Sequence, residues 1–156
     1  MRLSETLDLE PAHSGLRSDG RARIAGLLAP DALRQLTGAI SDVSKWLLVT
    51  RLGEKHLNLD AAAMRDLPPA QRAEFDGRVA TAARAGFQYL YETYPLYDKA
   101  HAGTLEAEAP VLARLFAFLN GETFLGAMRD VLDAPQISFA DGQLTCYRGG
   151  HFLTRH

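Results

Sequence analysis

Cysteine is almost absent from this sequence, since Cys146 is its single example in 156 residues. One cysteine cannot form an intrachain disulfide, which favours a reducing compartment. An excess of charge of one sign is also lacking, because 17 Lys and Arg stand against 19 Asp and Glu, for a net charge of −2. This balance gives no electrostatic reason to expect a nucleic acid or an anionic membrane as partner. We expect a protein, peptide or small-molecule partner instead.

Long apolar runs are missing as well. No stretch of about eighteen consecutive apolar residues is present, as a membrane-spanning helix would need. The start, MRLSETLDLEP, has neither the basic nor the apolar region of a secretory signal. These features predict a soluble, cytoplasmic protein. Repeats, low-complexity segments and Pro/Gly-rich linkers are also lacking, so we expect an N-terminal arm with little structure over residues 1–20 and a single domain over residues 21–156.

The first part of the predicted domain combines strand and helix patterns. Residues 21–28 look like a strand, and Pro30 suits the first turn of a short amphipathic helix. Residues 46–50 and 55–59 are apolar or partly β-branched, and Gly53 lies between them. This arrangement predicts a β-hairpin in which Gly53 supplies the turn.

Helical spacing dominates the middle of the chain. Asp60 can cap a short helix, which Pro68 and Pro69 then interrupt. A long helix is expected to follow and to end near Pro95, because seven apolar residues share one of its faces. These residues are Phe75, Val79, Ala82, Ala83, Phe87, Leu90 and Tyr94. The aromatic residues among them are therefore expected to pack in the core, which leaves Tyr89 and Tyr91 as candidates for an interaction surface.

Two further helices are expected over residues 111–119 and 124–132, with Asn120 and Gly121 separating them. After Pro135 the pattern changes from helical to alternating. Helices followed by strands favour the α+β fold class.

The last segment predicts a strand, a turn and a second strand. Leu144 and Cys146 would face one side of the first strand, and Thr145 and Tyr147 the other. Arg148-Gly149-Gly150 would then turn the chain, so that the two strands form a hairpin. Phe152, Thr154 and His156 would share one face of the second strand.

This segment, YRGGHFLTRH from Tyr147 to His156, resembles the approach to the metal site in prolyl-4-hydroxylase-like dioxygenases that depend on 2-oxoglutarate and Fe(II). In that family a Tyr, a Gly-containing turn and an apolar strand lead into a His-Xaa-Asp/Glu pair. The preceding helices are similar to the family's helical layer. The resemblance implies a helical layer that backs a double-stranded β-helix, which is a jelly-roll or cupin-like fold, with only its first strands present.

The resemblance also implies the chemistry. Two His and one carboxylate hold Fe(II) on one face and leave positions for 2-oxoglutarate and O₂. His156 matches the first iron ligand, and Tyr147 matches the residue that hydrogen-bonds a carboxylate of 2-oxoglutarate. The family hydroxylates C–H bonds, with peptidyl proline as the first substrate to consider and ascorbate as an optional accessory. The other ligands and the basic residue that pairs with 2-oxoglutarate would follow His156, so we expect the 156-residue chain to be inactive alone.

Simpler explanations stand beside these roles. His156 could be an ordinary solvated side chain, and Tyr147 a packed strand aromatic with its hydroxyl at the surface. The alternative function is a non-catalytic binding or assembly module with a partial jelly-roll. An unpaired sheet edge after the last strand would also favour self-association.

Overall fold

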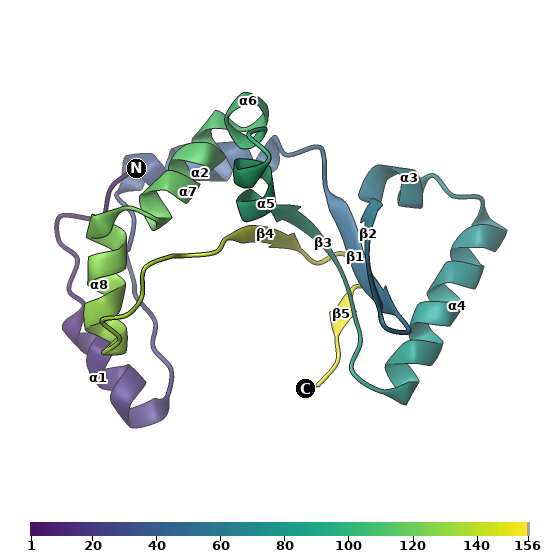
Figure 1. Ribbon diagram of the computed structural model, residues 1–156, viewed down its shortest axis with the longest axis horizontal. Helices are drawn as coiled ribbons and strands as arrows, with labels where there is room; N and C mark the ends of the chain where they lie inside the picture. Colours follow the sequence, from purple (N-terminus) through teal and green to yellow (C-terminus); the bar gives the residue numbers. More distant parts are fainter. Residues whose placement is uncertain (156) are drawn as a thin grey trace. The chain divides into compact units, whose positions relative to one another are not determined.

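The computed structural model describes residues 1–155, and the chain divides into two compact units. Unit 1 combines Met1–Asp42 with Leu96–Gly142, and unit 2 combines Val43–Pro95 with the segment from Gln143 onward. Figure 1 shows that unit 1 consists of helices and connecting segments, while unit 2 carries the β-strands. Each unit buries apolar residues of its own.

Unit 1 packs six helices around its own apolar core. They are α1 (Glu10–Asp19), α2 (Pro30–Ser41), α5 (Leu96–His101), α6 (Leu105–Glu108), α7 (Pro110–Leu119) and α8 (Glu122–Leu132). The apolar helix α7 contacts α2 and α5, and α8 contacts α1. Leu112 of α7 is fully buried, and Leu125 and Val131 of α8 are nearly so. The predicted break at Asn120-Gly121 between α7 and α8 is confirmed.

The first thirty residues differ from the sequence prediction. Helix α1 forms where an unstructured arm was expected, because Pro11 lies in its first turn and Gly20 ends it in the left-handed conformation, with a φ of 67°. The strand predicted over residues 21–28 is wrong. Only Leu28 pairs, in an isolated antiparallel bridge to Leu3.

Unit 2 is built on an open antiparallel sheet. Its strands are β1 (Leu47–Leu52), β2 (Lys55–Asp60), β3 (Tyr89–Pro95), β4 (Gln143–Cys146) and β5 (Phe152–Leu153). The strand order is β2-β1-β3-β4, and β5 also pairs with β3. The predicted hairpin is confirmed as β1 and β2, and Gly53 in their turn has a φ of 62°.

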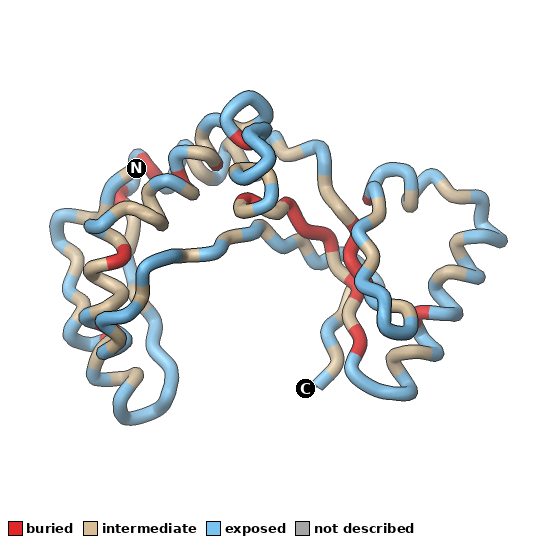
Figure 2. Tube along the Cα trace, viewed as in Figure 1, coloured by how far each residue is buried: buried red, intermediate tan, exposed pale blue. Residues whose placement is uncertain are grey.

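Two helices cover one face of this sheet, which we call the helix side. They are α3 (Ala61–Arg65) and α4 (Pro69–Ala85), and Figure 1 shows both beside β1 and β2. The buried residues Leu48, Ala61, Val79 and Leu90 form the centre of the core between them. Burying each large apolar side chain contributes roughly 1.5–3 kcal/mol. Figure 2 shows the same concentration of buried residues along β1 and β3.

The predicted cap of α3 at Asp60 and the predicted break at Pro68-Pro69 are both confirmed. The Asp60 carboxylate accepts a hydrogen bond of 2.8 Å from the backbone N–H of Ala63, which caps α3. Pro68 and Pro69 end that segment and begin α4, because proline needs no donor in the first helical turn.

The long helix predicted to reach Pro95 is wrong in its second half. Helix α4 ends at Ala85, and β3 occupies Tyr89–Pro95. Aromatic and β-branched residues favour a pleated strand, and the alternation of Tyr89, Tyr91 and Thr93 has the strand period of two. Leu90 and Tyr94 are buried as predicted, but on the helix side of a sheet.

The predicted C-terminal hairpin is also wrong. Strands β4 and β5 do not pair with each other; both pair antiparallel with the same edge of β3. The ladder stops at the Cys146–Glu92 pair and resumes at the Phe152–Leu90 pair. Residues 147–151 therefore form a loop inserted into one interrupted edge strand.

The α+β class is confirmed, because residues 1–155 form helices and a small open antiparallel sheet of five strands. The double-stranded β-helix stays a prediction. Within residues 1–155, no single helix is long and apolar enough to cross a membrane. Helices α7 and α8, bent by 48° at their break, reach that length and composition only as a pair.

Candidate functional site

Tyr147, the predicted cosubstrate contact, lies directly after β4 at the start of the inserted loop. Its neighbour Cys146 pairs with Glu92, whose side of β3 faces the helices. Because side chains alternate along a strand, Tyr147 points to the opposite face. The side chain is 53 % exposed, so a small molecule can reach it.

Aromatic rings form a row on this second face of the sheet. The Tyr147 ring stacks on Tyr91, with centroids 5.4 Å apart and 24° between the ring planes. Tyr91 contacts Tyr89 at 5.9 Å, and Tyr89 contacts His56 of β2 at 5.8 Å. We call the surface formed by these four residues the aromatic face. Offset aromatic pairs of this kind contribute about 0.5–1.5 kcal/mol beyond the area that they bury.

A hydrogen-bonded triplet lies at one end of the aromatic face. Nδ1 of His56 lies 2.6 Å from the Tyr89 hydroxyl, and its Nε2 lies 2.8 Å from Oδ1 of Asn58. With Asn58 accepting from Nε2–H, the lone pair on Nδ1 is free to accept the phenol proton of Tyr89. Burial raises the pKa of Tyr89, the nearby Tyr91 raises it further, and the charge of Arg51 opposes both.

A second polar cluster lies on the helix side, directly behind Tyr147. Glu92 of β3 is 2 % exposed, yet it carries a carboxylate. Nε of Arg148 donates to it at 2.9 Å, and Nη1 of Arg65, from α3, at 2.5 Å. The hydrogen bond and the charge of Glu92 raise the pKa of Arg148. Because removing either arginine leaves a buried charge poorly compensated, this cluster is sensitive to substitution.

His156, the predicted first iron ligand, lies outside the described residues. Within residues 1–155, no three His, Cys, Asp or Glu side chains come together as a metal-binding group. His151 is in the inserted loop, where its Nδ1 accepts from the backbone N–H of Arg148 at 3.1 Å. The described residues therefore do not by themselves fit an iron ion.

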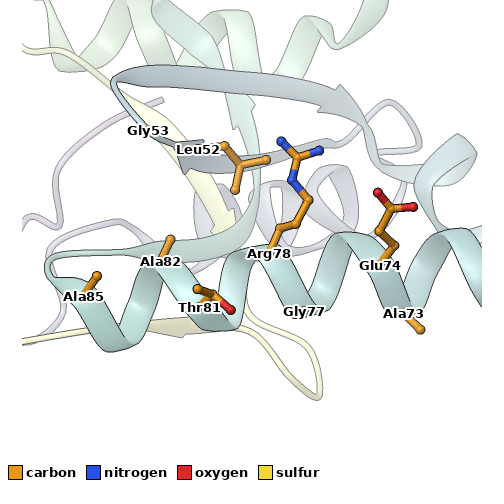
Figure 3. A pocket seen from close by; sticks show the side chains of 9 residues that line it. All are labelled: Leu52, Gly53, Ala73, Glu74, Gly77, Arg78, Thr81, Ala82 and Ala85. Atoms are coloured by element: carbon orange, nitrogen blue, oxygen red, sulfur yellow. The ribbon is translucent and has the colours of Figure 1, made fainter.

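An open groove of about 830 Å³ lies elsewhere in unit 2, between α4 and the turn from β1 to β2. Figure 3 shows Arg78 rising from α4 toward Leu52, with Gly77 and Thr81 along the helix surface. Because its wall includes Leu52 of the helix side, this groove is separate from the aromatic face. It brings together one acidic and one basic side chain, Glu74 and Arg78, and no residue of the predicted site.

Sequence reasoning identified Tyr147 but missed the residues around it. Tyr89 and Tyr91 were expected to lie on a helix, but they lie in β3. The prediction that they stay outside the core agrees with their place on the aromatic face. The alternation of Tyr89, Tyr91 and Thr93 was the available signal. No local signal linked Glu92 to Arg148, because 56 positions separate them. Comparison with protein-family models, with curated proteins and with solved structures finds no match to this chain.

Proposed function

We propose that this chain belongs to a 2-oxoglutarate- and Fe(II)-dependent dioxygenase that hydroxylates a C–H bond, with peptidyl proline as the first substrate class to test. The observation that carries the proposal is the position of Tyr147, which is exposed on the sheet face opposite α3 and α4. A cosubstrate can approach that face without displacing α3 or α4. A cytoplasmic location belongs to the same proposal, since one free cysteine suits a reducing compartment.

The role proposed for the described residues is to bind the cosubstrate. A phenol O–H is a good donor to a carboxylate, and such charge-assisted hydrogen bonds are about twice as strong as neutral ones. The Tyr147 hydroxyl would donate to a carboxylate of 2-oxoglutarate, while the ring stays held against Tyr91. His156 remains the expected first ligand, and the resemblance implies that the other iron ligands follow it.

A non-catalytic binding or assembly module remains the second candidate. It is favoured by three large apolar side chains of unit 2 that stay 46–53 % exposed around the aromatic face. These are Phe87, Tyr147 and Leu153. Exposed apolar and aromatic surface is typical of protein–protein contacts.

The deciding experiment measures binding of 2-oxoglutarate to the natural protein that contains these residues. With Fe(II) under anaerobic conditions, we expect Tyr147→Phe to weaken 2-oxoglutarate roughly tenfold or more, because a hydrogen bond to a charged group is lost. Tyr97→Phe, in α5 of unit 1, is the matched control and should leave the affinity unchanged.

Turnover completes the test. The natural protein should form succinate in an Fe(II)-dependent reaction, whereas the 156-residue chain alone should form none. Equal affinities of wild type and Tyr147→Phe would contradict the role of Tyr147. Failure of the natural protein to bind 2-oxoglutarate or to form succinate would favour the binding module.

A further inference from the structure

The loop that carries Tyr147 is closed by a short turn and by its own histidine, since Nδ1 of His151 accepts from the backbone N–H of Arg148 at 3.1 Å. The backbone N–H of His151 donates to the carbonyl of Arg148 at 2.9 Å, and Gly150 turns the chain with a φ of 85°. Residues 147–150 are all exposed, so water competes for these backbone groups. A contact from outside the loop is a further anchor.

Glu92 provides that anchor from the neighbouring strand. It is the last β3 residue paired with β4 before the loop begins, opposite Cys146. Its Oε2 accepts from Nε of Arg148 at 2.9 Å, and its Oε1 is bound separately by Arg65. A carboxylate that is 2 % exposed has little contact with water, so losing either arginine contact costs more than losing a surface ion pair.

The two consecutive residues Tyr147 and Arg148 reach opposite sides of the sheet. The Arg148 side chain extends to Glu92 on the helix side, and the Tyr147 ring lies on Tyr91 on the aromatic face. Because neighbouring residues of an extended chain point in opposite directions, fixing one side chain restricts the other.

We propose that Glu92 is a positioning residue, whose buried carboxylate holds Arg148 and thereby keeps the Tyr147 ring stacked on Tyr91. The significance of that ring for catalysis rests on the proposed function. The geometric claim does not, because it concerns only the Glu92–Arg148 ion pair and the tyrosine stack, which are contacts between protein side chains.

The test observes the Tyr147 ring directly by NMR on the chain with ¹³C-labelled tyrosine. The sequence has five tyrosines, so each ring signal can be assigned with one Tyr→Phe variant. Stacking on Tyr91 shifts the Tyr147 signals, and we expect Glu92→Gln and Arg148→Gln to remove most of this shift. Exchange of the two hydrogen-bonded amides of the loop, those of Arg148 and His151, should accelerate up to about tenfold in both variants, as expected for loss of a hydrogen bond to a charged group.

Arg65→Gln is the matched control. It removes the other arginine that donates to the Glu92 carboxylate, but Arg65 belongs to α3 and not to the loop. The Tyr147 signals should keep their shift in this variant. Arg148→Lys should restore part of it, since an ammonium keeps the charge but not the planar donor geometry.

Arg148 is about half exposed, so Arg148→Gln removes no core side chain and keeps the proposal testable if Glu92→Gln does not fold. An unchanged Tyr147 shift in folded Arg148→Gln would overturn the proposal. An equal loss of that shift in Arg65→Gln would also overturn it, because Glu92 would then have a general structural role. The proposed function can fail while the positioning role holds. In that case Glu92→Gln would displace the Tyr147 signals, but Tyr147→Phe would bind 2-oxoglutarate as tightly as the wild type.

Discussion

Tyr89 shows how one side chain can belong both to the sheet and to a polar network. Its ring lies between Tyr91 and His56 in the aromatic face, and its hydroxyl lies 2.6 Å from Nδ1 of His56. Burial, the first cause, and the neighbouring Tyr91 hold the pKa of Tyr89 above its ordinary value of 10.0. The folded protein therefore binds the phenol proton more tightly than the unfolded chain does.

This difference predicts a loss of stability in alkali. A raised folded-state pKa contributes stability that is complete below about pH 10 and is lost as the pH rises through the folded-state value. Tyr89→Phe has no phenol proton to release, so its free energy of unfolding should decline less above about pH 10 than that of the wild type. At about pH 8 the variant should be less stable by roughly 0.5–1.5 kcal/mol, because the hydrogen bond to His56 is lost.

Urea unfolding at several pH values measures both effects. The other tyrosines and lysines titrate in both proteins, so the quantity of interest is the difference between the two curves. Parallel curves from about pH 8 to 11 would show that Tyr89 does not carry the predicted proton linkage.

At the scale of elements, the change from α4 to β3 decides the architecture of unit 2. Phe75, Val79 and Ala82 follow helical spacing and do lie in α4. Phe87, Leu90 and Tyr94 continue the same helical spacing. Leu90 and Tyr94 nevertheless lie in β3 and share one of its faces, because residues separated by an even number of positions face the same side of a strand. An apolar pattern alone therefore could not fix the end of α4. The β-forming residues between these positions were the stronger signal.

Gln88 joins β3 to β1 at the point where β3 begins. Its side chain is 1 % exposed, and its amide acts in place of a peptide group. Nε2 donates to the carbonyl of Arg51, and Oε1 accepts from the N–H of Arg51 at 3.3 Å. The backbone N–H of Gln88 also donates to the Thr154 hydroxyl at 2.8 Å, which ties the last described residues to the same place.

Gln88→Met should therefore weaken the sheet. Methionine has a similar length but cannot replace the hydrogen bonds that the amide makes to Arg51, and leaving their partners unsatisfied costs about 1–3 kcal/mol. Gln71 in α4 offers a control, since Gln71→Met should stay within about 0.5 kcal/mol of wild type. Urea midpoints for the three proteins provide the comparison, and similar midpoints for both variants would contradict a role for the Gln88 amide.

At the scale of the whole molecule, some features of the candidate site could be predicted from local sequence patterns, and others depend on pairing between distant strands. The alternation around Leu144, Cys146 and Tyr147 is local, so it correctly predicted β4 and the side to which Tyr147 points. The partner of β4 is β3, and the Thr93–Gln143 contact already spans 50 positions. Long-range pairing of this kind depends on the whole fold, which explains why a local turn signal at Gly149-Gly150 led to the wrong prediction of a hairpin.

The division into two units has a direct consequence for folding stability. Leu48 is 2 % exposed in the core of unit 2, and Leu112 is 0 % exposed in unit 1. Truncating either leucine to alanine should cost about 2–5 kcal/mol. If each core stabilises mainly its own unit, Leu48→Ala should accelerate amide hydrogen exchange in unit 2 more than in unit 1, and Leu112→Ala should do the reverse.

Trp46 provides an independent probe, because it is the single tryptophan and packs against the core of unit 2. We expect its fluorescence midpoint in urea to fall more for Leu48→Ala than for Leu112→Ala. Equal shifts of that midpoint, with uniform acceleration of exchange along the chain, would instead show one cooperative domain, as the sequence alone predicted. The two leucine variants have the same chemistry, so the comparison depends only on where each side chain is buried.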